Sequence, residues 1–232
     1  MLSASNIPVP EASTSQLVQD RPTTVLLLPS FTFIDGVTPA STKDLIASYI
    51  SPAPTNTSRL QRDGQVASVP DVTGDSNLTK ALGALSVKQT SESPKTNFDT
   101  RPCPHKYLIL LCSQRTRDVR CGQSAPLLRR EFERHLRPLG LYRDLCDQRP
   151  GGVGIYFISH VGGHKFSANV MVYRKAEGEH SNGEASQCIW LARVRPEDCE
   201  GIIKFTVLQG KVVHPDRQLR GGFDRERGLV SW

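Results

Sequence analysis

The sequence predicts an α/β protein in which a β-α-β unit is followed by a β-β-α unit, after a partly disordered N-terminal region. Short runs of apolar, β-branched and aromatic residues recur after residue 106, as strands require. One amphipathic helical stretch separates the first two runs, whereas loops rich in Gly and polar residues separate the later ones. The residues before 101 are instead rich in Pro, Ser and Thr, a composition that buries little apolar surface.

Charge and reactive side chains are concentrated in the second part of the chain. Residues 1–100 hold seven Lys or Arg and nine Asp or Glu, whereas 101–232 hold the other 22 basic residues and every Cys and His. The first twenty residues contain two acids and no base, unlike a secretory signal or a mitochondrial presequence. No apolar run approaches the ~20 residues that span a bilayer. We therefore expect a soluble intracellular protein, cytoplasmic or mitochondrial, with reduced thiols.

The first hundred residues offer little material for a hydrophobic core. Residues 1–23 are expected to be disordered because Ser, Pro and Thr dominate them. Residues 24–50 predict one strand, stopped by Pro29, and one short capped helix. These are too few elements for a domain, so we expect this strand-helix remnant to dock on the core. Residues 51–100 predict a disordered linker.

Residues 101–215 form the predicted folded domain, and 216–232 a C-terminal tail. Residues 107–112 are apolar throughout, which is typical of a strand buried on both faces. A helix is expected from Ser124, with Pro126 in its first turn, where proline is tolerated. The later elements are expected to be strands at 154–159, 166–173 and 188–194 and a helix at 196–208. A right-handed crossover followed by a hairpin and a covering helix is the thioredoxin-like layout.

Two histidines, His160 and His164, flank a Gly-Gly pair between the second and third expected strands. In a helix this spacing would place both rings on one face, but each glycine costs about 1 kcal/mol there. A strand-loop-strand structure instead lets the backbone curl so that both imidazoles point at one object, such as a metal. The alternative is a polar hairpin tip whose histidines are neighbours without a shared ligand.

Two cysteines occupy positions that complement the histidines. Cys112 ends the first expected strand, and Cys121 lies just ahead of the first expected helix. In a β-α-β unit the C-terminal ends of adjacent parallel strands meet at one edge, where ligands bind. The two Cys and two His therefore converge as a candidate metal site for zinc or an iron–sulfur cluster. A thiol redox pair is a third interpretation, although the familiar spacing is Cys-x-x-Cys. Ordinary thiols are expected at Cys103, Cys146, Cys188 and Cys199.

Three motifs in this part resemble the sucrase/ferredoxin-like family. They are Cys-x₈-Cys-Gly with an internal Arg-Asp-x-Arg, Ser-His-x-Gly-Gly-His-Lys-Phe-x-x-Asn-Val, and Arg-Gly-Gly-Phe-Asp-Arg. The resemblance covers 103–232 strongly and 24–50 weakly, and it implies a thioredoxin-like ferredoxin with a [2Fe–2S] cluster. By position, the implied ligands are Cys112, Cys121, His160 and His164. Ala168 departs from the Gly of many relatives, and relatives have a fuller N-terminal half. We find no carboxylate pair suited to glycoside chemistry, despite the word sucrase.

The resemblance implies a non-catalytic electron carrier. Two thiolates and two neutral imidazoles give an oxidised cluster less negative charge than four thiolates, which favours electron uptake. Ring nitrogens that do not bind iron can titrate, so we expect proton uptake to accompany reduction. Arg115, Arg117 and Arg120, on the loop between the cysteines, would further favour the reduced state or else form a solvated basic loop.

The sequence also indicates classes of partner. No basic helix, interleaved aromatic platform or RNA-binding signature is present, so nucleic acid is not expected. A basic rim suits an acidic redox partner protein. The last three residues resemble a C-terminal tripeptide by which cytosolic iron–sulfur clients are recognised by their assembly machinery, with Trp232 as anchor; alternatively, its indole packs on the domain. The competing functions are electron transfer, a zinc-stabilised interaction module, and a thiol oxidoreductase using Cys112 and Cys121.

Overall fold

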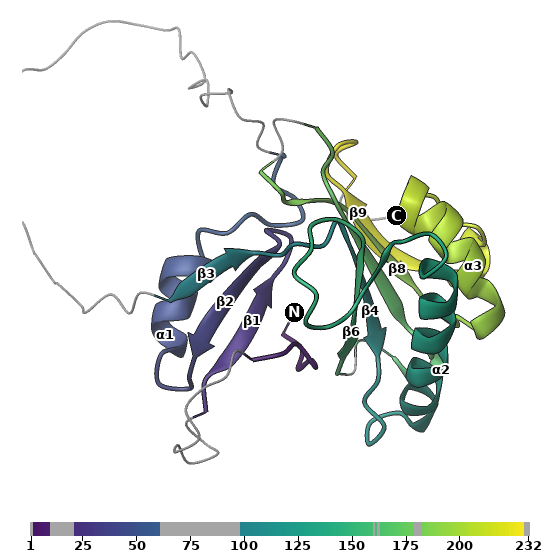
Figure 1. The fold of residues 1–232 in the computed structure, drawn as a ribbon, viewed down its shortest axis with the longest axis horizontal. Coiled ribbons are helices and arrows are strands. Elements are labelled where there is room, and N and C mark those ends of the chain that lie inside the picture. The colour runs from purple at the N-terminus through teal and green to yellow at the C-terminus, as the bar shows by residue number, and fades with distance from the viewer. Residues whose placement is uncertain are drawn as a thin grey trace, which may run out of the picture.

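The computed structural model describes residues 2–9, 21–60, 98–159, 161, 163–178 and 182–229. These residues form a mixed α/β structure with two sheets (Figure 1). The larger sheet has the strand order β5-β6-β4-β7-β8-β9, and the smaller has the order β1-β2-β3. The strands are β1 Thr23–Leu27, β2 Thr32–Val37, β3 Asp99–Pro102, β4 Tyr107–Cys112, β5 Tyr142–Arg143, β6 Val153–Ile158, β7 Val170–Lys175, β8 Ala185–Leu191 and β9 Leu219–Asp224.

Helices lie on the outer side of each sheet, α1 beside the smaller and α2 and α3 beside the larger (Figure 1). The helical segments are α1 Thr42–Leu45 with the π turn η2 Ile46–Ile50, α2 Val119–Leu136, the 3₁₀ turn η3 His164–Phe166, the continuous stretch η4 Pro196–Asp198, α3 Cys199–Gly201 and η5 Ile202–Val207, and α4 Pro215–Gln218. No helix in the described part of the chain is long and apolar enough to cross a membrane.

Strand β4 is the centre of the larger sheet, and all of its residues are buried, as predicted. It pairs in parallel with β6, with Cys112 opposite Ile158, and antiparallel with β7. Because side chains alternate along a strand, Ile109 and Leu111 pack on the helix side and Leu108 on the side of the smaller sheet. The β-α-β unit and the hairpin that follows it therefore share one central strand.

Helix α2 starts earlier than the sequence predicts. The prediction placed its start at Ser124, with Pro126 in the first turn, but the helix begins at Val119 and Pro126 lies inside it. The cause is the Asp118 side chain, which accepts the Arg120 backbone N–H at 3.0 Å and caps the helix. Cys121 is therefore in the first helical turn instead of ahead of the helix.

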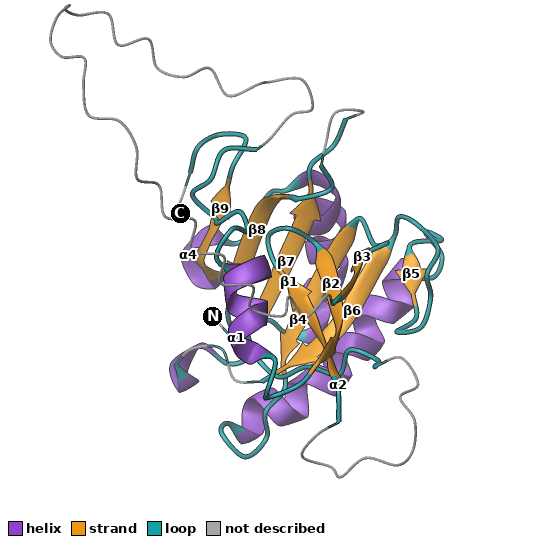
Figure 2. Cartoon of the chain, turned by 90° about the vertical axis from the view of Figure 1, so that its left-hand side faces the viewer, coloured by secondary structure: helices purple, strands orange, loops and turns teal. Residues whose placement is uncertain are grey.

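The smaller sheet differs from the predicted strand-helix remnant. Strand β2 was not predicted because Asp35 and Gly36 interrupt its apolar run, and β3 comes from the end of the expected linker. Phe31 and Phe33 bury their rings in a cluster that includes Leu108 of β4. The smaller sheet thus covers the face of the larger sheet opposite α2, as Figure 2 also shows.

Two segments expected to lack structure are partly ordered. Ser159 donates its backbone N–H to the Ala4 carbonyl at 2.8 Å, and Phe157 donates to the Asn6 side chain at 2.7 Å. The expected disorder of 1–23 is thus wrong for residues 2–9, because β5 pairs with only the start of β6 and leaves an edge that this segment fills. Residues 10–20 and 61–97, which include most of the expected linker, lie outside the described residues.

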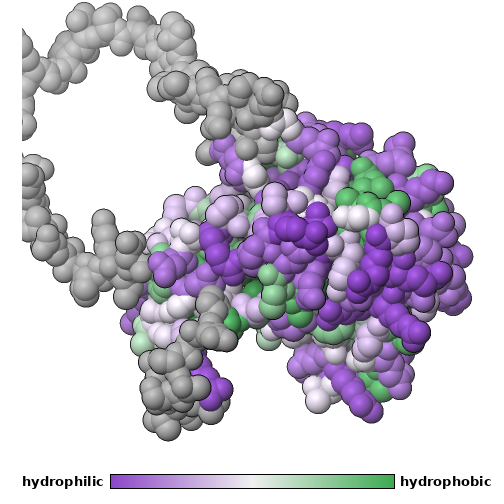
Figure 3. Space-filling view, viewed as in Figure 1, coloured by the Kyte–Doolittle hydropathy of each residue, from purple (hydrophilic) through white to green (hydrophobic). Residues whose placement is uncertain are grey.

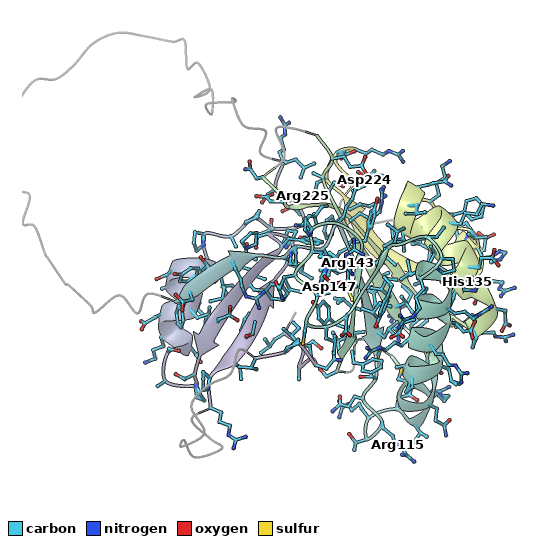
Figure 4. All side chains as sticks on the ribbon, in the orientation of Figure 1. Arg115, His135, Arg143, Asp147, Asp224 and Arg225 are labelled. Atoms are coloured by element: carbon cyan, nitrogen blue, oxygen red, sulfur yellow. The ribbon has the colours of Figure 1, made fainter. Side chains whose placement is uncertain are left out.

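The expected C-terminal tail contains strand β9, which pairs antiparallel with β8. This strand was not predicted, because its two glycines interrupt any apolar pattern and only backbone hydrogen bonds to β8 define it. Beyond it, Arg225 pairs with Glu184 at 2.7 Å and donates to the Ser58 carbonyl at 2.7 Å. Asp224 and Arg225 lie at the upper end of the molecule in Figure 4. Trp232 lies outside the described residues.

His105 is a buried histidine just before β4. Its ring lies against Gly154, where any Cβ would overlap it, and its Nε2 is 3.2 Å from the Tyr156 hydroxyl. Burial lowers the pKa of His105 to about 4; nearby cations add to this effect and Asp147 opposes it. The imidazole is therefore neutral at physiological pH.

This pKa predicts an acid-sensitive fold. The unfolded chain, with a histidine pKa near 6.5, binds the proton more readily, so stability is full above about pH 6.5 and falls as pH drops toward 4. At pH 5 the loss from His105 is at most about 2 kcal/mol. Urea unfolding at pH 7.5 and pH 5 should show a larger loss for wild type than for His105→Gln. Equal losses would show that other groups set the acid response.

Candidate metal or cluster site

The predicted cysteine pair meets at the C-terminal end of β4. Cys112 ends that strand, Cys121 lies in the first turn of α2, and both are buried. Their side chains lie within hydrogen-bonding distance of each other. The intervening loop turns the chain back over the end of the strand, so that the two thiols become neighbours.

Backbone amides surround the Cys112 sulfur. Val161 and Gln114 each provide a backbone hydrogen bond to it, which favours the thiolate. Burial outweighs them and raises the pKa of Cys112 to about 12, and the neighbouring Cys121 adds to the rise. The isolated thiol is thus protonated at neutral pH, which argues against a nucleophilic role. A bound metal would displace the proton and use the amides as hydrogen-bond donors to a ligating sulfur.

A hydrogen-bonded chain ties Cys121 to the segment that follows η3. The Cys121 thiol lies 3.4 Å from the Ser167 hydroxyl, which in turn donates to the Asp118 carboxylate at 2.5 Å. The same carboxylate caps α2. One acidic side chain thereby fixes both the helix start and the polypeptide beyond η3.

Arg220 of β9 links the other parts of the site. Its guanidinium carbon lies 3.8 Å from the Phe166 ring centroid and 4.4 Å from that of Trp190. Its Nη1 donates to the Asn169 side chain at 3.0 Å, and the Asn169 carbonyl accepts the Cys112 backbone N–H at 3.1 Å. Arg220 therefore connects η3 with the end of β4. The sequence motif contains Arg220, but a cation held between distant aromatic residues leaves no local pattern.

The structure describes the backbone of one of the two histidines and the side chain of neither. His160 lies outside the described residues, and of His164 only the backbone, in η3, is described. The flanks are fixed: Ile158 pairs with Cys112, and Val161 contacts its sulfur. The parallel arrangement that brings the two strand ends together is thus confirmed, whereas the four-ligand set stays a prediction.

The described residues include only part of the ligand set that the sequence predicts. Among the side chains that the structure places, no three His, Cys, Asp or Glu form a group that could hold a metal ion. Cys112 and Cys121 provide two of the four expected ligands. Adjacent buried thiols with N–H donors are compatible with zinc and with an iron–sulfur cluster. The residues therefore fit the implied cofactor as far as they are described.

The four cysteines outside the pair form no disulfide in the described structure. Cys103, Cys188 and Cys199 are buried, and Cys146 is exposed. Burial raises the pKa of both Cys188 and Cys199 to about 12.

The Arg220 contacts predict a measurable stability difference. Arg220→Met removes the charge and the hydrogen bond to Asn169 and should lower the free energy of unfolding by about 1–2 kcal/mol, whereas Arg220→Lys should lose less. Urea unfolding of the cluster-free protein measures this, with the exposed Arg217→Met as the control. An Arg220→Met variant as stable as that control would contradict the assigned role.

Comparison with known proteins places the chain in a family. The sucrase/ferredoxin-like family profile matches residues 1–221. Actin patches distal protein 1 of Saccharomyces cerevisiae is 40% identical over 115 residues, which cover 48% of this chain and 34% of that protein. Altered inheritance of mitochondria protein 32 is 35% identical over 109 residues in Clavispora lusitaniae (47% of this chain, 33% of that protein) and 36% identical over 124 residues in Meyerozyma guilliermondii (53% and 35%).

These matches span about a third of the length of the curated relatives. No solved structure matches the chain significantly. Since the family profile covers nearly all of it, the chain belongs to the sucrase/ferredoxin-like family.

Proposed function

We propose that this chain is an electron-transfer protein that holds one [2Fe–2S] cluster. Its ligands in this proposal are Cys112, Cys121, His160 and His164. The observation that carries the proposal is the buried thiol pair at the end of β4, with backbone amides directed at the Cys112 sulfur. The neighbouring order β6-β4-β7-β8 supports a thioredoxin-like ferredoxin domain, because it places the parallel pair beside the hairpin.

The chain's own residues would set the properties of the bound group. A [2Fe–2S] cluster supplies reversible one-electron chemistry. The Gln114 and Val161 amides stabilise negative charge on the Cys112 sulfur, and burial excludes water from both thiols. Neutral imidazole in place of two thiolates favours electron uptake. The proposal includes coupled proton uptake at the ring nitrogens that do not bind iron.

Structural zinc is the second candidate because two adjacent thiols are also zinc ligands. The long loop between the cysteines suits a larger object, which favours the cluster. A thiol oxidoreductase has less support, since Cys112 is buried and its pKa is raised to about 12.

We also propose a cellular location and classes of partner for this chain. Names of relatives refer to inheritance of mitochondria and to actin patches, and we propose that the chain works in the cytoplasm or mitochondria. Its partners would be redox proteins and, through Trp232, the cytosolic iron–sulfur assembly machinery.

Metal and sulfide analysis of anaerobically purified protein tests the proposal. We expect iron and acid-labile sulfide at about two each per chain, with the absorption and EPR spectra of a [2Fe–2S] centre. Cys112→Ala and Cys121→Ala should lose the cluster, whereas the exposed Cys146→Ala should retain it. His160→Cys or His164→Cys should retain a cluster of lower potential, because an anion replaces a neutral ligand. Stoichiometric zinc without iron would falsify the proposal and support the zinc module.

A further inference from the structure

We infer that the face beside the cysteine pair is a docking surface for an acidic redox protein. This inference rests on the proposed electron-transfer function and specifies its partner. The surface, called the basic rim below, combines cations from three separate segments. They are Arg115, Arg117 and Arg120 around the start of α2, Lys165 in η3, and Arg193 after β8, all exposed.

Backbone and side-chain contacts bring these three segments together. A Cβ at Gly122 would lie 2.5 Å from the Arg115 Cβ, so Arg115 crosses the first turn of α2 beside Cys121. The Arg193 backbone N–H donates to the Phe166 carbonyl at 3.1 Å, which joins Arg193 to η3. The bond between Ser167 and Asp118 joins that segment to the α2 start. The three segments that carry the basic rim therefore lie next to one another, beside the first turn of α2 that holds Cys121.

The cations of the basic rim have fewer acidic partners than the arginines farther along α2. Farther along the helix, Arg129 pairs with Glu133 at 2.7 Å and Arg134 with Glu131 at 2.7 Å. At the basic rim, Arg120 pairs with the buried Asp118 at 3.2 Å. Within the described chain, no ion pair involves the other four members of the rim. Positive charge is thus concentrated at the end of α2 that holds Cys121.

The neighbouring surface also suits a protein partner. Val119 is 52% exposed among these cations, and protein interfaces combine arginine with apolar contacts. Arg115 points away from the body of the molecule at its lower tip in Figure 4. Hydrophilic side chains cover much of the face over α2 in Figure 3. Phe166 already stacks on Arg220 and so offers no open ring for a nucleic-acid base. These features favour carboxylates on a protein over RNA.

Electron transfer to two proteins of opposite charge tests the docking surface. The reduced, cluster-loaded protein would be mixed at low salt with plastocyanin, an acidic copper protein, or with cytochrome c, a basic haem protein. Arg115→Glu/Arg117→Glu should slow oxidation by plastocyanin at least about tenfold and remove most of its salt dependence. The same variant should speed oxidation by cytochrome c.

The matched control carries the same change in net charge elsewhere. Arg21→Glu/Lys43→Glu alters exposed cations beside β1 and in α1, on the side of the molecule away from α2 (Figure 1). We expect this variant to change the rate with plastocyanin less than about twofold. Equal slowing by the two double variants would show an effect of net charge alone and overturn the inference.

A titration that needs no cluster separates this inference from the proposed function. Plastocyanin added to the ¹⁵N-labelled, cluster-free chain should shift amide signals at 113–120, 163–167 and 192–195. Such shifts in a chain that never binds iron would refute electron transfer but retain the acidic docking surface. Shifts elsewhere in a chain that does bind a cluster would refute the docking surface alone. Tighter binding of a short RNA at these amides would overturn the acidic-protein partner.

Discussion

The parallel pairing of β4 with β6 is the constraint on which the candidate site depends. It places Cys112 opposite Ile158, and hence the segment that contains His160 starts beside the first cysteine. Because every residue of β4 is buried, a shift in register would expose apolar side chains or bury polar ones, so packing fixes the position of Cys112. The smaller sheet contributes by covering the face of β4 that α2 leaves open.

Two polar side chains then fix the positions of other parts of the site relative to β4. Asp118 starts α2 at the residue that places Cys121 in the first turn, and it also accepts a hydrogen bond from Ser167. Arg220 reaches η3 and Asn169 from the far strand β9. Both connect segments that are remote in sequence, so the site depends on the sheet being complete. This explains how two buried thiols are held next to each other without a disulfide.

Sequence patterns predicted the parts of this fold that have a strong apolar period. The run at 107–112, the strand at 154–159 and the parallel crossover agree with the structure. The third expected strand, 166–173, starts only at Val170, because His164–Phe166 form a 3₁₀ turn. Cys112 and Cys121 lie together at the strand end, whereas the four-ligand set stays a prediction. The predicted start of α2 was wrong. Pro126 is common in the first turn of a helix and suggested a start at Ser124, whereas the Asp118 cap that sets the actual start is not marked by an apolar pattern. Strands β2, β3 and β9 were missed because Asp, Gly and Pro interrupt them and backbone pairing alone defines them. Neither Ser167 nor Arg220 was assigned a role, since their partners are distant in sequence.

The most direct measurement of the central claim is pulsed EPR of the reduced protein labelled with ¹⁵N only in the histidine rings. Cysteine sulfur and backbone nitrogen stay unlabelled, so any strong ¹⁵N coupling reports imidazole bound to iron. If the segment beside Cys112 completes a [2Fe–2S] site, two strongly coupled ¹⁵N nuclei should appear, and His160→Cys or His164→Cys should each leave one. A reduced cluster without strong ¹⁵N coupling, or protein with no paramagnetic centre after anaerobic reduction, would contradict the account.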